Sequence, residues 1–193
     1  RAQKVYSQVK ITQDAGDITA SPEIDAVAVI TPVSTHYNLV KEALNNGKHI
    51  FVEKPFTANT GEAEELLELA EKKKLKIMVD HTFLFTGAVR KIKEVVDKNV
   101  LGDFLYYDST RVNLGLFQHD VNVIWDLIPH DLAIMDYIVK NKPVAISARG
   151  VDHFGRGLED IAYVTVYFGN NMIAHFNVNW LSPAKVRLTL IGG

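Results

Sequence analysis

The sequence predicts an α/β protein in two parts: a parallel sheet with helices, followed by an α+β domain with a largely antiparallel sheet. In the first part, short continuous apolar runs alternate with amphipathic segments, which is typical of buried parallel strands linked by helices. After His81, runs that alternate residue by residue dominate, which is typical of antiparallel strands with one buried face. We therefore expect domains at 1–81 and 82–193, the second of them incomplete.

The first part has apolar runs and helix-capping residues in regular succession. Its predicted strands are 26–30, 48–52 and 76–80. Ser34 can cap the first helix, and Asn59 or Thr60 the second. The predicted buried stripe of the second helix is Ala63, Leu66, Leu67 and Ala70. Residues 1–9 are interpreted as the tail of a further helix. This succession indicates a parallel sheet with right-handed crossovers.

The second part has more strands than helices. Helices are predicted at about 86–98 and 128–140, the latter with Ile128, Leu132, Met135 and Val139 on its core stripe. The predicted strands are 104–113, 144–151, 161–168, 172–180 and 186–191. Gly169-Asn170-Asn171 is typical of a hairpin turn. The glycines of 150–157 follow no phosphate-binding pattern, so we interpret this stretch as a strand connection with His153 at the surface.

Composition and charge exclude several classes of protein. The 193 residues carry a formal net charge of −2 and no cysteine, so neither nucleic acid nor an anionic membrane is an expected partner, and thiolate metal sites are excluded. No apolar run approaches the ~20 residues of a membrane-spanning helix. A cytoplasmic location is expected. Because the sequence starts with Arg1 and stops directly after a strand-like run, we also expect it to be a piece of a longer protein.

Lys54 lies just past a predicted strand, in Glu53-Lys54-Pro55. Ligands of parallel sheets bind beyond the carboxyl ends of the strands, so Lys54 is a candidate site residue, although most lysines are simply solvated. Thr31, Pro32 and His36 follow the preceding strand, hence lie at the same edge of the sheet. By itself, His36 is more typical of a helix start than of a ligand.

Asp126 and His130 are four residues apart near Pro129, which we expect in the first turn of a helix. This spacing puts both side chains on one helix face, where a carboxylate can orient an imidazole that acts as a general base. The alternative is a capping network in which His130 is a bystander. Arg111 could clamp an anion or form an ordinary ion pair. Asp80-His81 and His119-Asp120 offer metal ligands, but we expect no metal site.

These motifs together resemble the Gfo/Idh/MocA oxidoreductases. The resemblance covers essentially the whole chain and rests on the run 26–32, on the segment Gly47 to Pro55, and on Asp126 and His130. Within the family, the segments 111–115 and 120–131 look most like UDP-N-acetylglucosaminuronate dehydrogenases. The resemblance implies that 1–81 is the C-terminal part of a Rossmann nucleotide-binding domain, a partial Rossmann-type sheet. It also implies that 82–193 is a substrate and oligomerisation domain.

The resemblance implies NAD or NADP as cofactor, a sugar or UDP-sugar as substrate, and oxidation of a secondary hydroxyl by hydride transfer. Lys54, Asp126 and His130 would be the catalytic group. The nicotinamide and ribose would contact Thr31, Pro32, His36, Glu53 and Lys54. The implied substrate contacts are Arg111, Asn113 and Asn122.

One departure from the family leaves alternatives open. The Gly-rich turn that holds the cofactor phosphates is not found in this sequence. The resemblance implies that the full-length protein is an enzyme. Because the turn is not found, the residues of this sequence alone are expected to have weak catalytic activity or none. The alternatives are a polyol or aldose dehydrogenase, and a non-catalytic sugar-binding or oligomerisation module. A homo-oligomer is expected to form through the C-terminal sheet.

Overall fold

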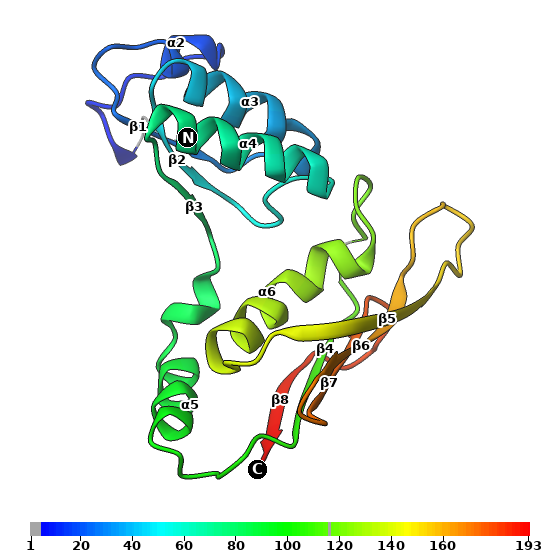
Figure 1. Ribbon diagram of the computed structural model, residues 1–193. Helices are drawn as coiled ribbons and strands as arrows, with labels where there is room; N and C mark the ends of the chain where they lie inside the picture. The colour runs from blue at the N-terminus through cyan, green and yellow to red at the C-terminus, as the bar shows by residue number, and fades with distance from the viewer. Residues whose placement is uncertain (1–4, 116) are drawn as a thin grey trace. The chain divides into compact units, whose positions relative to one another are not determined.

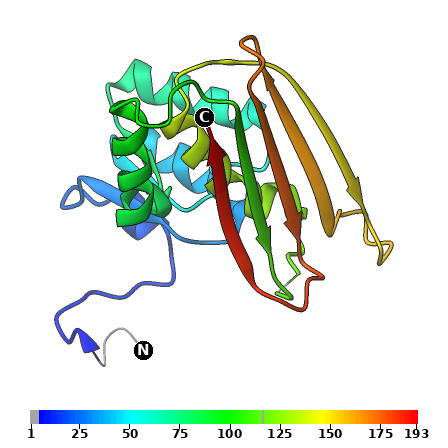
Figure 2. The same cartoon turned by 90° about the horizontal axis from the view of Figure 1, so that it is seen from below.

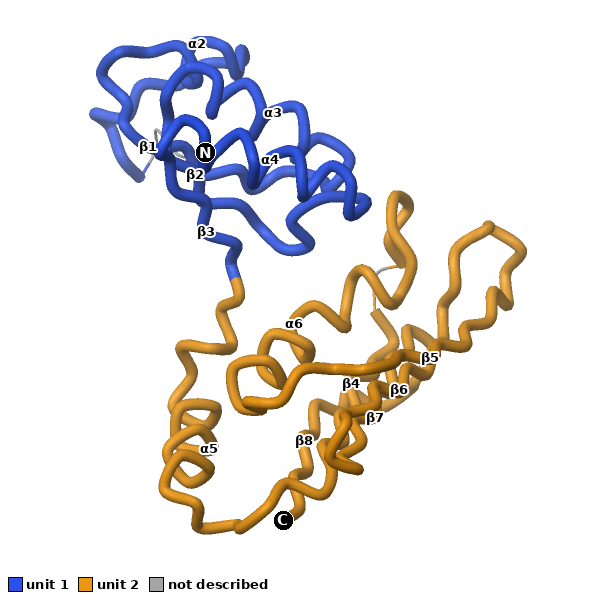
Figure 3. Tube along the Cα trace, viewed as in Figure 1, with its two compact units in different colours: residues 1–80 blue, residues 81–193 orange. Residues whose placement is uncertain are grey.

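The computed structural model describes residues 5–115 and 117–193. The chain forms two compact units, Arg1–Asp80 and His81–Gly193 (Figures 1 and 3). Each unit has its own hydrophobic core. Within the described residues, no helix is both long and apolar enough to cross a membrane.

The first unit is built around a parallel sheet with strand order β1-β2-β3. Its strands are β1 (Ala26–Val29), β2 (His49–Val52) and β3 (Ile77–Val79). Its described helices are α2 (Gly16–Thr19), α3 (Val33–Asn45) and α4 (Thr60–Lys73). Val40 and Leu44 of α3 and Leu66 of α4 pack with Val29 and Val52 of the sheet. The predicted parallel sheet with helices is confirmed.

The helix ends of this unit follow local chemistry. The Asn59 side chain accepts a hydrogen bond from the Glu62 backbone N–H at 3.0 Å, as predicted for the cap of α4. The predicted cap at Ser34 is wrong, because α3 begins at Val33 and Pro32 occupies its N-cap position without a side-chain cap. Leu67 is also wrong as a core residue, since it is 54% exposed while the neighbouring Leu66 is buried. Of the predicted helix at 1–9, residues 1–4 lie outside the described residues, and 6–9 are not helical.

The second unit holds a five-stranded sheet with strand order β5-β6-β7-β4-β8. Its strands are β4 (Tyr106–Val112), β5 (Pro143–Val151), β6 (Ile161–Phe168), β7 (Ile173–Asn179) and β8 (Val186–Gly192). Strands β4 and β7 are parallel, and the other neighbours are antiparallel. Figure 2 shows these strands side by side. The predicted, largely antiparallel sheet is confirmed.

Helices cover one face of this sheet. They are the 3-10 helix η1 (Thr82–Phe85), α5 (Gly87–Asp97) and α6 (Val123–Ile138). Alternate residues of the central strands, such as Val164 and Phe176, are buried against Ile128 and Ile138 of α6. The intervening residues face outward, and Tyr163 there is 49% exposed. One face of the sheet thus carries the core of the unit, and the other remains open.

Helix α6 begins five residues earlier than predicted, at Val123 instead of Ile128. Asn122 is its N-cap, and its side chain accepts a hydrogen bond from the Trp125 N–H at 3.0 Å. Pro129 therefore lies inside the helix and not in its first turn. The helix tolerates this proline because the apolar face of α6 is held by tertiary packing, which outweighs local propensity.

Candidate active site

The first unit gathers polar residues at the carboxyl end of its sheet. Thr31 and Pro32 follow β1, and Glu53 and Lys54 follow β2. Since β1 and β2 are parallel neighbours, the two segments leave the sheet at the same edge, as the sequence predicts. In doubly wound sheets this edge is where a dinucleotide binds.

His36 joins these two segments. It is fully buried, and its Nδ1 lies 3.0 Å from the Pro55 carbonyl oxygen while its Nε2 lies 2.8 Å from the Thr31 carbonyl oxygen. The Lys54–Pro55 peptide bond is cis, and the Lys54 backbone N–H donates to the Glu53 carboxylate at 2.6 Å. His36 is therefore a brace that fixes the backbone around Lys54.

In the second unit, Asn122 holds the start of α6. Besides capping the helix, it donates through Nδ2 to the Glu159 carboxylate at 2.7 Å. The Glu159 carbonyl accepts from the Val123 N–H at 2.9 Å. Both polar atoms of the Asn122 side chain thus have partners within this unit, and they fix the first turn of α6 on the segment before β6.

Asp126 and His130 lie four residues apart on α6, which gives them one helix face. The Trp180 indole Nε1–H donates to Asp126 Oδ2 at 3.1 Å, and Trp180 itself is only 1% exposed. The imidazole of His130 packs edge-on against the ring of Phe83, with ring centroids 4.8 Å apart. Aromatic neighbours therefore hold the carboxylate and the imidazole in place.

Arg111 and Asp131 form a buried ion pair beside this face. Arg111 Nε and Nη2 donate to the two carboxylate oxygens of Asp131 at 2.7 and 2.8 Å. The two side chains are 7% and 5% exposed. The Tyr107 hydroxyl donates to the Asp131 carbonyl at 3.3 Å. Burial raises the pKa of Tyr107 above its usual range, and the charge of Asp131 adds to the shift.

Asn113 follows β4 directly, and its backbone N–H donates to the Asn179 carbonyl at 3.0 Å. Its side chain is half-buried, at the point where β4 ends beside the end of β7. Among the described residues, no group of three or more His, Asp or Glu side chains is placed to hold a metal ion.

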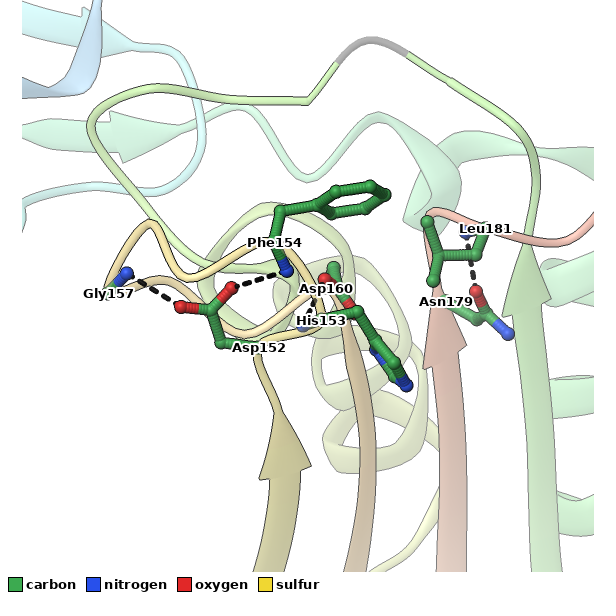
Figure 4. A network of polar contacts seen from close by, with 7 residues as sticks. All are labelled: Asp152, His153, Phe154, Gly157, Asp160, Asn179 and Leu181. Carbon is green, nitrogen blue, oxygen red and sulfur yellow. Dashed lines mark hydrogen bonds and ion pairs between the residues drawn. The ribbon is translucent and has the colours of Figure 1, made fainter.

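In the loop between β5 and β6, two aspartate carboxylates accept hydrogen bonds from other residues of the loop (Figure 4). Asp152 accepts from the backbone N–H groups of Phe154 and Gly157 at 3.1 and 2.7 Å. Partial burial raises the pKa of Asp152, but these backbone donors outweigh it and hold the pKa below the usual value. Asp160 is fully buried and accepts from the backbone and ring of His153 at 2.8 and 2.6 Å. These contacts fit the predicted strand connection.

Three neighbours of the site were not predicted from the sequence. Asp131 is the partner of Arg111, Trp180 holds Asp126, and Phe83 contacts His130. Asp131 could have been found from its phase, since it lies three residues after Ile128 and four before Met135 on the core stripe. Trp180 and Phe83 gave no such signal, because they approach α6 from distant parts of the sequence.

Comparison with known families follows the division into two units. Residues 1–81 match the model of an oxidoreductase family with an NAD-binding Rossmann fold, and residues 89–193 match the Gfo/Idh/MocA C-terminal domain. The chain belongs to the Gfo/Idh/MocA oxidoreductase family. The resemblance noted from the sequence is thereby confirmed.

Similar proteins include a dehydrogenase of a nucleotide sugar and a dehydrogenase of an inositol. The chain is 33% identical over 132 residues to UDP-N-acetylglucosamine 3-dehydrogenase of Acidithiobacillus ferrooxidans, a match that covers 67% of this chain and 40% of the relative. It is 28% identical over 158 residues to scyllo-inositol 2-dehydrogenase (NAD(+)) of Bacillus subtilis, covering 78% and 46%. The chain thus spans less than half the length of these two relatives.

A solved structure of the Acidithiobacillus UDP-N-acetylglucosamine 3-dehydrogenase superposes with a TM-score of 0.83 and 25% identity, covering 97% of this chain and 60% of that one. Apo scyllo-inositol dehydrogenase from Lactobacillus casei has a TM-score of 0.87 at 20% identity, covering 100% and 60%. The predicted affinity with UDP-sugar dehydrogenases is supported by both the sequence match and the structural match to the Acidithiobacillus enzyme.

Proposed function

We propose that the protein carrying this chain is an oxidoreductase that oxidises a secondary hydroxyl of a sugar or UDP-sugar with NAD or NADP. The observation that carries the proposal is the 33% identity over 132 residues with a dehydrogenase of UDP-N-acetylglucosamine. The sequence match to an NAD-binding Rossmann family over 1–81 supports the choice of cofactor. Absence of cysteine is compatible with the cytoplasmic location that we propose as well.

The proposed chemistry gives each member of the catalytic group one task. The nicotinamide, when bound, supplies the hydride acceptor. His130 accepts the proton of the substrate hydroxyl as general base. Lys54 donates a hydrogen bond to the same oxygen and stabilises its developing negative charge. Asp126 accepts a hydrogen bond from the Trp180 indole N–H at 3.1 Å. This contact fixes its carboxylate on the face of α6 that carries His130, where it would orient the imidazole or the sugar.

The other proposed site residues bind or support. Thr31, Pro32 and Glu53 would hold the nicotinamide and ribose end of the cofactor, together with Lys54, and the buried His36 would support them by fixing the backbone at Thr31 and Pro55. These residues fit that end of a dinucleotide because they share the carboxyl edge of β1 and β2. Asn113 is the proposed direct contact with the substrate. Arg111 and Asn122, whose partners are Asp131 and Glu159, would act by fixing α6 beneath it.

Substitution of the catalytic group tests the proposal. In the intact protein, His130→Ala and Lys54→Ala should each lower kcat about 100-fold or more, because a general base and an oxyanion donor each contribute at least that much. Matched controls are His119→Ala and Lys72→Ala, both at exposed positions. Turnover is followed as the absorbance of reduced nicotinamide with a UDP-sugar as substrate. Full activity in both catalytic variants would refute the assignment.

A second candidate, oxidation of a free polyol, is favoured by the 28% identity with scyllo-inositol 2-dehydrogenase. Kinetics with inositol and with a UDP-sugar, measured side by side, separate the two candidates. A kcat/KM that is higher for inositol favours the polyol. A protein that binds inositol and the UDP-sugar without oxidising either would be a binding module instead.

We also propose that the protein is a homo-oligomer formed through the open face of the second sheet. Exposed apolar side chains on that face are Tyr163, Tyr167, Ile173, Leu188 and Leu190. Several exposed apolar side chains on one face of a sheet favour a protein interface there. Leu188→Glu should lower the mass measured by light scattering, whereas a monomeric wild-type protein would refute the proposal.

A further inference from the structure

Arg187 is an exposed cation on the helix-covered side of the second sheet. It lies on β8, opposite Arg111 of β4, and its position is exposed whereas Arg111 is buried. The residues in phase with them, Tyr107 and Ile191, also face the helices. Two guanidinium groups therefore stand next to each other on the same face.

The two arginines differ in how their charge is balanced. Asp131 neutralises Arg111 through two hydrogen bonds. Arg187 forms no ion pair with any residue in the described ranges 5–115 and 117–193. Like charges directly opposite each other on neighbouring strands destabilise a sheet, and one carboxylate balances only one of them. The fold thus retains a cation whose charge is offset by no carboxylate of the described residues, although its guanidinium contacts the ring of Phe83.

The ring of Phe83 links Arg187 to the candidate base. The Arg187 guanidinium carbon lies 5.5 Å from the centroid of the Phe83 ring, and that of Arg111 lies 4.6 Å from it. The His130 imidazole packs against the same ring at 4.8 Å. Arg187 and His130 are therefore no farther apart than the sum of their two distances to Phe83, a span that a sugar ring and its substituents can bridge.

We infer that Arg187 binds an anionic group of the substrate, a carboxylate or a phosphate, while His130 acts on a hydroxyl of the same molecule. This inference rests on the proposed function, and it narrows the substrate class to acidic or phosphorylated sugars. A guanidinium matches both anions because it can donate two parallel hydrogen bonds. The Phe83 ring lies against the Arg187 guanidinium and limits the orientations of its plane.

A binding measurement tests the inference without any turnover. The intact protein is titrated with glucuronate, inorganic phosphate and glucose, and the NMR resonances of the Arg187 guanidinium and the His130 imidazole are followed. One or both anions should shift these resonances while glucose does not. Arg187→Gln should weaken the anion affinity about 10-fold or more, and Arg187→Lys should restore part of it. The control is Arg149→Gln, on the exposed edge strand β5.

Steady-state kinetics then identify the source of the charge. A uronic acid is compared with its neutral hexose, and a UDP-sugar with the free sugar. Arg187→Gln should raise KM about 10- to 100-fold for the charged member of one pair, as expected for a lost charge-assisted hydrogen bond. The neutral member should be unaffected. Added salt should raise KM for the charged substrate in the wild type but not in the variant.

The results that would overturn the inference differ from those that would overturn the proposed function. If Arg187→Gln changes KM equally for charged and neutral substrates, Arg187 does not bind the anion. An unchanged anion affinity in Arg187→Gln would lead to the same conclusion. A wild-type protein that oxidises no sugar would refute the proposed function, and the NMR titration would still decide whether Arg187 binds an anion.

Discussion

Replacement of Asp131 by Asn tests the buried ion pair with Arg111 and changes little besides the charge. The amide nearly matches the carboxylate in shape, so the packing of α6 on the sheet is retained. The substitution leaves a guanidinium that is 7% exposed without its counter-charge. It also replaces one acceptor oxygen by an NH2 group that faces an Arg111 donor. Loss of one partner of a buried pair typically destabilises a protein by about 3–5 kcal/mol.

The chain offers a matched control on the same helix. Asp136 pairs with Lys142 at 3.8 Å, with side chains that are 75% and 85% exposed. Exposed pairs of this kind contribute about 0–1 kcal/mol, so Asp136→Asn should have little effect. The two Asp→Asn variants thus differ chiefly in the burial of the pair.

Urea unfolding followed by tryptophan fluorescence measures the effect. Both tryptophans, Trp125 and Trp180, belong to the second unit, so the signal reports on the unit that holds the pair. Asp131→Asn should lower the free energy of unfolding by about 3–5 kcal/mol, and the double variant Arg111→Met/Asp131→Leu should recover most of it. A loss below about 1 kcal/mol, or a double variant as unstable as the single one, would refute the reasoning.

Three further predictions concern neighbours of the same helix. Because burial raises the pKa of Tyr107, the unfolded chain ionises first, and the free energy of unfolding should fall as pH rises above about 10. Tyr107→Phe should flatten this fall in urea titrations at alkaline pH, and an unchanged slope would contradict it. Asn122→Ala should lower the free energy of unfolding by about 1 kcal/mol through loss of the cap, whereas Asn122→Ser should retain most of it. Trp180→Phe keeps an aromatic ring but loses the donor to Asp126. In a kinetic assay it should lower kcat about tenfold with a smaller change in KM, and an unaltered kcat would remove Trp180 from the positioning of Asp126.

The strands could be predicted closely because each one carries its own pattern. The run at 26–30 is apolar throughout, and β1 spans Ala26–Val29. Strand β6 alternates with period two, and it spans the predicted residues 161–168. Strand order is a different matter, since β4 lies between β7 and β8. That order depends on pairing between residues distant in sequence, which no local pattern contains.

The start of α6 was mispredicted because a local rule was given too much weight. A proline inside a helix removes one backbone hydrogen bond, which favours a helix start near Pro129. The structure places the start at the Asn122 cap. Asn122 has the side chain of a typical helix cap, but the family resemblance implies a contact between this residue and the substrate. In the structure, the Asn122 side chain accepts from the Trp125 N–H and donates to the Glu159 carboxylate, which favours a capping role.

The burial pattern of the sequence could have indicated that Arg111 has a counter-charge within the fold and that Arg187 does not. Asp131 lies in phase with Ile128 and Met135 on the buried stripe of α6, and a buried carboxylate needs a cation or hydrogen-bond donors beside it. Arg111 lies in phase with the buried Tyr107 and Ser109 of β4, so the alternation of that strand already makes it the candidate partner. Because Asp131 pairs with Arg111, no carboxylate among residues 5–115 and 117–193 forms an ion pair with the opposite arginine on β8. An anion from outside the described residues is then the simplest partner for Arg187, which is why the neutral substrate is the decisive comparison for that residue.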